Sequence, residues 1–340
     1  MFFAAQTNHP LTVSLVMIDR CFDTVSKTTL LIPVFNEEQF FRHCLESAVN
    51  QVDHVIIGDN ASTDGTEAIG REFADKYQHV QYIRRDTNVG AAENLARLAQ
   101  MVKTEFVIQI GAHDELPENY IATLKNLLNA NPDAACAYGN CSWLELDGTI
   151  SQALDFASVR TGMLDDDPYR RAASFFYGKQ PCDLIFGLFR SSSAIPIFAE
   201  TKPIAGCDHI LVVAALLDGK FVYAPDTTYL RRMVHPNDND KDYMTRIVGE
   251  RSSQRMSRDY MAAGKQIVEW CWKHHDRQNL SSAQKKDFRK LLFQIALKFD
   301  TPIGHPFWDS AFFLRGLWRK LSKLLKYKLL PGYAKKKGYA

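Results

Sequence analysis

The chain has 340 residues, of which 46% are hydrophobic and 24% are charged, and its formal net charge is +2. These values are typical of a soluble protein with one or two domains, and they exclude a protein that binds polyanions through its overall charge. The 7 cysteines are scattered without a C-x-x-C pair, which favours reduced thiols in a cytoplasmic protein over disulfides or a zinc site. No apolar run reaches the roughly 18 residues that a membrane-spanning helix needs.

Residues 1–26 contain an apolar patch from Leu11 to Ile18. A signal peptide would carry a basic region before such a patch and a small-residue cleavage site after it, and this segment has neither. We therefore interpret residues 1–26 as a loosely packed leader segment.

From residue 28 onward, strand and helix patterns alternate four times. The helices between the strands are expected to end near Val49, Tyr77 and Val102, where apolar residues with helical spacing stop. Such a succession predicts a right-handed, doubly wound parallel sheet. The strands are expected at 28–35, 54–58, 80–84 and 106–110, with the last near the centre of the sheet.

The second part of the chain mixes short strands with helices. The acidic cluster 165–167 before Pro168 is most simply the charged start of a helix, rather than a metal site. Strands are expected at 134–138, 142–146 and 221–224, with a D-G turn after the second. Helices are expected from Pro117 to about Ala130, and at 208–219, 243–275, 281–299 and 306–330.

Residues 105–117, EFVIQIGAHDELP, combine the central strand with three ionisable side chains. Gly111 leaves room for a tight bend, after which His113, Asp114 and Glu115 follow the carboxyl end of the strand. In open α/β sheets, ligands bind at this edge. Acidic residues before a helix that begins with proline are also ordinary helix caps, so the pattern by itself is compatible with a purely structural role.

Five motifs follow one another over about 90 residues, a spacing that fits successive strand and helix units. They are IPVFNEE (32–38), LESAVNQ (45–51), GDNASTDGT (58–66), RDTNVGAAEN (85–94) and AHD (112–114). In this order they resemble the nucleotide-sugar-binding half of the family 2 inverting glycosyltransferases of the GT-A fold, bacterial surface-polysaccharide type.

The resemblance implies a fold and a division of the chain. The fold class is α/β, with a GT-A-like doubly wound, mainly parallel sheet flanked by helices and a C-terminal helical extension. The implied glycosyltransferase domain covers 27–235, with a nucleotide-sugar-binding half (27–116) and an acceptor half (117–235). Residues 236–340 then form a helical region with a basic tail.

The resemblance also implies which residues hold the nucleotide sugar. The turn after the first strand and the Asp after the second hold the base in the family, and these positions are Pro33, Phe35, Glu37 and Asp59 here. The family segment beside the nucleotide corresponds to Arg85, Asn88 and Gly90, and Gly90 would allow close approach of the backbone. Without the resemblance, Arg85 would be interpreted as a solvated surface charge.

A divalent metal, Mn²⁺ or Mg²⁺, is the cofactor that the resemblance implies. Asp114 matches the last carboxylate of the family's metal signature, and one carboxylate with phosphate oxygens is a usual ligand set for such cations. His113 departs from the pattern, because many relatives carry an acid there; an imidazole can bind a ribose hydroxyl but adds no negative charge. In the family's closing segment, matched by YLRRMVH (229–235), the final His235 joins the metal or the diphosphate.

Asp208 is the candidate general base, because residues 204–225 resemble the family segment in which an acidic pair opens a helix. Here the pair is Cys207 and Asp208, so the first acid is missing and the Asp is kept. Inversion needs a carboxylate on the face opposite the diphosphate, to take the proton of the acceptor hydroxyl. The alternative interpretation is that Asp208 caps the helix.

The last predicted helix, 306–330, has an apolar stripe that includes Phe307, Leu314 and Trp318, flanked by Arg and Lys. A basic helix with such a face is typical of an anionic membrane interface, and a core-packed or dimer-forming helix is the alternative. We favour the membrane, since bacterial relatives often act on lipid-linked saccharides at the inner face of the cell membrane.

The sequence therefore predicts a metal-dependent inverting glycosyltransferase that uses a nucleotide diphosphate sugar, with a UDP-sugar as first choice, and a saccharide or lipid-linked saccharide acceptor. It predicts no nucleic-acid partner. One alternative is a non-catalytic nucleotide-sugar-binding or scaffold protein, suggested by His113 and Cys207. Another is a sugar nucleotidyltransferase, which would normally carry a glycine-rich basic loop after the first strand, where residues 36–38 are Asn-Glu-Glu.

Overall fold

The computed structural model describes residues 26–154, 160–176, 182–201, 204, 206–232, 234, 256–274 and 280–299. The predictions for the leader before residue 26 and for the helix 306–330 lie outside these residues.

One 8-stranded sheet runs through the described part of the chain, in the order β3-β2-β1-β4-β7-β5-β6, with β8 paired to β5. The first four strands are parallel, and β4 lies at the middle of the sheet. The predicted parallel arrangement and the central place of the fourth strand are therefore confirmed. The bounds of these strands are Thr28–Val34 (β1), His54–Asp59 (β2), Val80–Arg84 (β3) and Phe106–Gln109 (β4).

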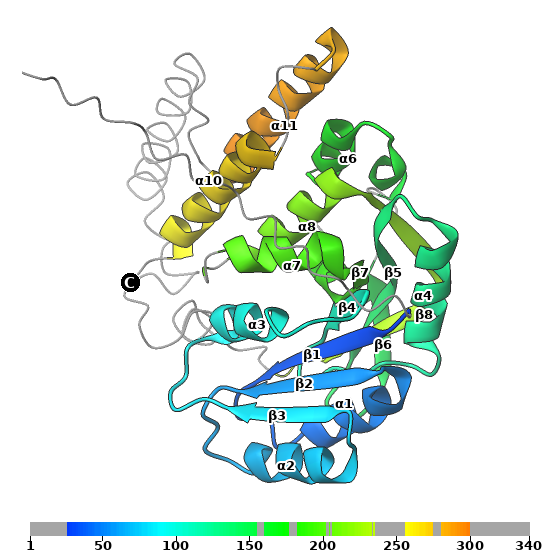
Figure 1. Cartoon of the computed structure of the whole chain (residues 1–340), viewed down its shortest axis with the longest axis vertical. Helices are drawn as coiled ribbons and strands as arrows, with labels where there is room; N and C mark the ends of the chain where they lie inside the picture. The colour runs from blue at the N-terminus through cyan, green and yellow to red at the C-terminus, as the bar shows by residue number, and fades with distance from the viewer. Residues whose placement is uncertain are drawn as a thin grey trace, which may run out of the picture.

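Helices cover both faces of this parallel part. Figure 1 shows α1 and α2 on one side of β1, β2 and β3, and α3 on the other, as a doubly wound sheet requires. Helix α1 buries the apolar positions that predicted it, Phe41, Cys44, Leu45 and Ala48. The helix bounds are Phe41–Ala48 (α1), Thr66–Lys76 (α2), Ala91–Ala99 (α3) and Tyr120–Ala130 (α4).

The second half of the sheet differs from the sequence-based expectation in the lengths of two strands. The short strands expected at 134–138 and 142–146 are one strand, and the strand expected at 221–224 continues to Arg232. The two long strands pair along their length, and their register shifts near Gly139 instead of ending there. A Cβ at Gly139 would lie 2.6 Å from the backbone oxygen of Thr227, so only glycine lets the strands approach at this irregular point. The bounds are Ala134–Leu144 (β5), Ile150–Leu154 (β6), Leu188–Arg190 (β7) and Lys220–Arg232 (β8).

Helix α6 (Pro168–Ser174) begins where the acidic cluster predicted a helix. Its cap is Asp167, whose side chain accepts hydrogen bonds from the backbone N–H groups of Tyr169 and Arg170. The buried Arg171 donates to the backbone oxygens of Leu216 and Leu217, near the end of α8 (Cys207–Asp218). The cluster is therefore a helix start, as expected, and α6 supports α8.

The C-terminal described helices pack against the acceptor half. Helices α10 (Met256–His274) and α11 (Ser282–Phe299) lie side by side in Figure 1, and α10 also contacts α8 while α11 contacts α6. Helix α7 (Ser191–Glu200) contacts α3 and α8. Five cysteines in the described ranges are free thiols: Cys44, Cys136, Cys141, Cys207 and Cys271. None of the described helices is both long and apolar enough to cross a membrane.

Candidate active site

A cavity of about 300 Å³ opens at the carboxyl ends of β1 and β4. Its walls come from the loops after these strands, the start of α3, the 3₁₀ segment Cys182–Phe186, helices α7 and α8, and the end of β8. Six of the predicted site residues line it: Pro33, Phe35, Glu37, His113, Asp114 and Asp208. The predicted donor side and the predicted base, which are far apart in sequence, thus meet in one space.

The loop after β4 folds tightly back on itself at Gly111. The backbone N–H of Asp114 donates to the oxygen of Gly111 at 3.0 Å. A Cβ on Gly111 would lie 2.5 Å from Oδ2 of Asp114, so glycine is required here by the close approach of the carboxylate. The bend that the sequence predicted therefore positions Asp114 directly.

Asp114 is buried, with 1% of its surface exposed, and both carboxylate oxygens are held by β8. The hydroxyl of Tyr229 donates to Oδ2 at 2.5 Å, and the backbone N–H of Arg232 donates to Oδ1 at 2.8 Å. Burial and the charge of Asp114 raise the pKa of Tyr229 well above its ordinary value, so the hydroxyl remains a donor. The carboxylate is thus fixed in orientation at the cavity wall.

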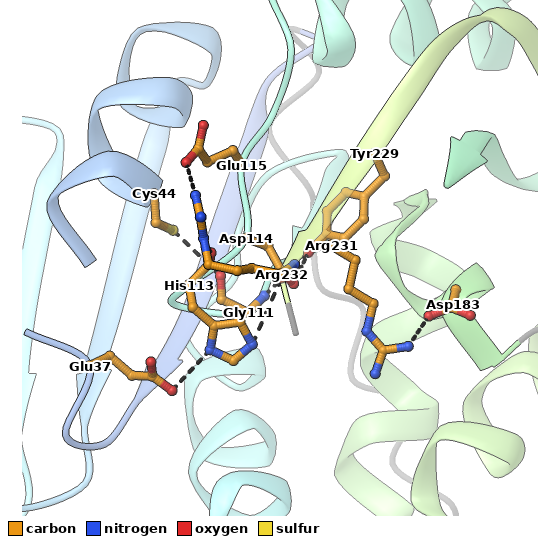
Figure 2. Close-up of polar contacts among 10 residues, drawn as sticks. All are labelled: Glu37, Cys44, Gly111, His113, Asp114, Glu115, Asp183, Tyr229, Arg231 and Arg232. Atoms are coloured by element: carbon orange, nitrogen blue, oxygen red, sulfur yellow. Dashed lines mark hydrogen bonds and ion pairs between the residues drawn. The ribbon is translucent and has the colours of Figure 1, made fainter. Parts of the chain in front are cut away.

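Arg231 and Arg232 are neighbours in β8 and point in opposite directions, because side chains alternate along a strand (Figure 2). Arg232 pairs with Glu115, donates to the backbone oxygens of His113 and Glu145, and lies 4.3 Å over the ring of Phe40. It therefore holds the loop that carries Asp114. Arg231 instead lines the cavity.

Glu37 and His113 form a pair beyond the carboxyl ends of β1 and β4. Oε1 of Glu37 lies 2.9 Å from Nδ1 of His113, and Nε2 of the same ring lies 3.8 Å from Asp114 (Figure 2). Burial lowers the pKa of His113, but the hydrogen bond to Glu37 and the charges of Asp114 and Glu37 outweigh it and raise that pKa above its ordinary value. The imidazole of His113 is thereby paired with a carboxylate from another loop.

Asp59 is not among the residues that line the cavity. Its side chain is fully buried and accepts hydrogen bonds from the backbone N–H of Ser62 and the hydroxyl of Tyr82. The next residue, Asn60, reaches the cavity and was not singled out from the sequence. A contact between Asp59 and the base stays a prediction; in this structure the carboxylate shapes the loop that presents Asn60.

Arg85, Asn88 and Gly90 were predicted to lie beside the nucleotide. They do not line the cavity, but Asn88 and Arg85 contact residues that do. Nδ2 of Asn60 donates to Oδ1 of Asn88, which also accepts from the N–H of Gly90, at 2.8 Å each. Gly90 has a φ of 85° and precedes α3, a conformation that favours glycine. Nε of Arg85 donates to Asn94 at 3.3 Å, and burial together with the charge of Arg97 lowers the pKa of Arg85. Arg85 is partly buried and is not a fully solvated surface charge.

Asp208 lies in the first turn of α8. The cap position belongs to Gly206, whose φ is 88°, so the interpretation of Asp208 as the cap itself does not hold. Oδ1 of Asp208 accepts a hydrogen bond from the N–H of His209 and lies 3.0 Å from its Nδ1. The His209 ring is buried against Phe175 and Phe299, the last residue of α11.

The described residues could supply only part of the ligand set of a metal ion, and the substrate would supply the rest. No group of three or more His, Cys, Asp or Glu side chains among them could hold a metal ion. Asp114 lines the cavity, and a carboxylate has lone pairs beyond the two that Tyr229 and Arg232 engage. One such carboxylate with phosphate oxygens and water is a usual set for Mg²⁺. The second predicted ligand, His235, lies outside the described residues.

The roles of several residues at this site could not be predicted from the sequence. Tyr229, Arg231 and Arg232 belong to the segment YLRRMVH, but the pattern does not say which side chain faces the cavity. That depends on the register of β8 against β5. Asn60 sits in a D-N-x-S-T turn, in which its amide is also simply a turn residue.

Comparisons with known proteins address the family and the fold of the chain. Residues 29–160 match the family described as "Glycosyl transferase family 2". The chain is 27% identical to the uncharacterized glycosyltransferase YibD of Escherichia coli, over 36% of each chain. It is 28% identical to the abequosyltransferase RfbV of Salmonella typhimurium, over 30% of this chain and 32% of that protein. It is 31% identical to the poly(ribitol-phosphate) beta-glucosyltransferase of Bacillus spizizenii, over 31% of this chain and 18% of that protein.

The similarity thus spans about a third or less of these curated relatives. Among solved structures, TarS residues 1–349 of S. aureus superimposes with a TM-score of 0.55 at 13% identity, over 80% of this chain and 72% of that one. This likeness shows the GT-A-like fold. The expected fold class is confirmed, and the match to the glycosyltransferase family 2 model covers residues 29–160 of this chain.

Proposed function

We propose that this protein transfers a sugar, with inversion, from a nucleotide diphosphate sugar to a saccharide acceptor in surface glycan biosynthesis. A UDP-sugar is the first candidate donor and a lipid-linked saccharide the first candidate acceptor. The observation that carries the proposal is the single cavity in which the loops after β1 and β4 face Asp208 of α8. The match to the family 2 model supports the reaction class, and the cavity supports the proposal by bringing the predicted donor side and the predicted base together.

On the donor side, the end of β1 and the loop after it offer Pro33 and Phe35 as an apolar surface for the base. The Glu37 and His113 pair offers polar atoms for the ribose, since both line the cavity. Asp114 would hold Mn²⁺ or Mg²⁺ in a shell shared with the diphosphate. When bound, that cation would neutralise negative charge on the diphosphate.

On the acceptor side, Asp208 is the proposed general base. Inversion in one step requires that the acceptor oxygen attack C1 from the face opposite the diphosphate, while a carboxylate takes the hydroxyl proton. Asp208 comes from a different element than the donor loops and is 28% exposed at its side chain. The bond from C1 to the diphosphate oxygen breaks as the bond from C1 to the acceptor forms, and the proton goes to Asp208.

The experiment that tests the proposal is turnover with defined sugars. Purified full-length protein is incubated with UDP-, GDP- and dTDP-sugars and a panel of saccharide acceptors, and release of the nucleoside diphosphate is measured. NMR of the product reports whether the anomeric configuration is inverted. Release that needs an acceptor, with inverted product, is expected. Tight donor binding without any turnover would favour the non-catalytic alternative.

We also propose that the protein is cytoplasmic and binds the inner face of the cell membrane through the basic helix predicted at 306–330. Each basic residue near an anionic surface contributes on the order of 1 kcal/mol. Co-sedimentation with anionic vesicles should be lost at high salt and in a 1–305 truncation that still binds nucleotide. A truncation that unfolds would instead favour packing of this helix against the core.

A further inference from the structure

The cavity is lined by more negative than positive side chains. Among the described residues that line it, Glu37, Asp114 and Asp208 are carboxylates, and Arg231 is the one Lys or Arg. His113, the other basic group there, is engaged by Glu37. A diphosphate adds further negative charge to this space, and buried charge is costly unless it is paired. Arg231 is therefore the side chain that the charge balance singles out.

Arg231 is also held in place for such a contact. Its Nη1 donates to Oδ1 of Asp183, in the 3₁₀ segment beside the cavity (Figure 2). Its guanidinium carbon lies 5.1 Å from the ring centre of Trp143 and 5.8 Å from that of Phe186, so aromatic rings support the planar group.

The guanidinium of Arg231 has more N–H donors than its bond to Asp183 uses. It carries five N–H donors, and Asp183 is its one hydrogen-bond partner within the described ranges. The side chain of Arg231 is 38% exposed, whereas that of Arg232, its neighbour in β8, is 4% exposed. Arg231 can therefore bind an anion in the cavity without giving up Asp183.

We propose that Arg231 binds the diphosphate of the donor and stabilises the charge that develops on the leaving nucleoside diphosphate. As the bond from C1 breaks, its electron pair goes to the diphosphate oxygen, and the fixed guanidinium beside that oxygen lowers the energy of the step. A bidentate Arg–phosphate contact also orients the leaving group. The inference rests on the proposed transferase function and adds a protein cation to the predicted metal.

The test compares nucleoside diphosphates with their nucleosides. Full-length wild type, Arg231→Met and Arg231→Lys are titrated with UDP, GDP and dTDP by calorimetry, and with uridine, guanosine and thymidine by ligand-observed NMR. Each titration is made with Mn²⁺ and with EDTA. The matched control is Arg42→Met, because Arg42 forms an exposed pair with Glu72 away from the cavity.

Arg231→Met should lower diphosphate affinity by about 10- to 100-fold, the range expected for a lost charge-assisted hydrogen bond, and leave nucleoside affinity unchanged. Arg231→Lys should retain part of that affinity, and Arg42→Met all of it. Equal losses for diphosphate and nucleoside, or no loss for either, would overturn the role of Arg231 while leaving the transferase proposal intact. If wild type binds none of the three diphosphates, both proposals fail.

Discussion

The hydroxyl of Tyr229 donates a hydrogen bond of 2.5 Å to Oδ2 of Asp114, across 115 residues of sequence. This bond joins the last part of β8 to the loop after β4. Tyr229→Phe removes one donor from a buried carboxylate and should lower the free energy of unfolding by about 1–3 kcal/mol, measured by urea denaturation. Tyr77→Phe, at a partly exposed tyrosine that packs on Phe73, should change it little. Equal stability of Tyr229→Phe and wild type would mean that the bond contributes nothing.

The two neighbouring arginines of β8 should respond differently to the same substitution. Arg232→Met loses the pair with Glu115 and two bonds to backbone oxygens, so we expect a loss of at least about 2 kcal/mol in unfolding free energy. Arg231→Met should lose less, because its side chain is more exposed. Thermal and urea unfolding of both variants measure the difference, and the reverse order would contradict our assignment of Arg232 as the structural residue.

Asp208→Asn should leave donor affinity nearly intact and lower turnover by roughly 10²-fold or more, since general-base catalysis typically contributes about 10²–10⁴. The measurements are calorimetry with the donor and acceptor-dependent release of the nucleoside diphosphate. Asp218→Asn, at the other end of α8, serves as the control on the same helix. Full activity of Asp208→Asn would remove Asp208 from the mechanism.

Asp114→Ala should abolish the part of nucleotide affinity that depends on Mn²⁺, because it removes the one carboxylate we assign to the metal. Asp114→Asn keeps the shape of the side chain and should show the same loss with a smaller effect on folding. Calorimetry with UDP, with Mn²⁺ and with EDTA, gives the comparison. An unchanged Mn²⁺ dependence would show that the metal assignment is wrong and make His235 the next candidate.

The parallel part of the fold could be predicted because its signals are local. Strands β1, β2 and β4 are short, mostly apolar runs, and α1 is buried along the residues whose spacing predicted it. The lengths of β5 and β8 could not be predicted. Gly139 and Pro225 interrupt their sequence patterns, yet pairing between the two strands continues past both.

In the candidate site, too, some residues could be predicted from the sequence and others could not. Glu37, His113 and Asp114 follow strands, so the common edge of a parallel sheet brought them together as expected. The contacts of Tyr229, Arg231 and Arg232 depend on long-range register, which no short segment specifies. Asp59 is the last residue of β2 instead of the first loop residue after it, and its buried carboxylate accepts a hydrogen bond from Tyr82 of the neighbouring strand.

The bonds between Asp114 and β8 also determine when the site can be completed during synthesis. Chains are made from the N-terminus, so the loops after β1, β2 and β4 leave the ribosome well before Tyr229 and Arg232 do. Until β8 is made, the carboxylate of Asp114 lacks both of the donors that fix it. A nascent chain that stops before residue 229 should therefore present the loops after β1, β2 and β4 without an ordered Asp114. Competence to bind the diphosphate should appear only once β8 has joined the sheet.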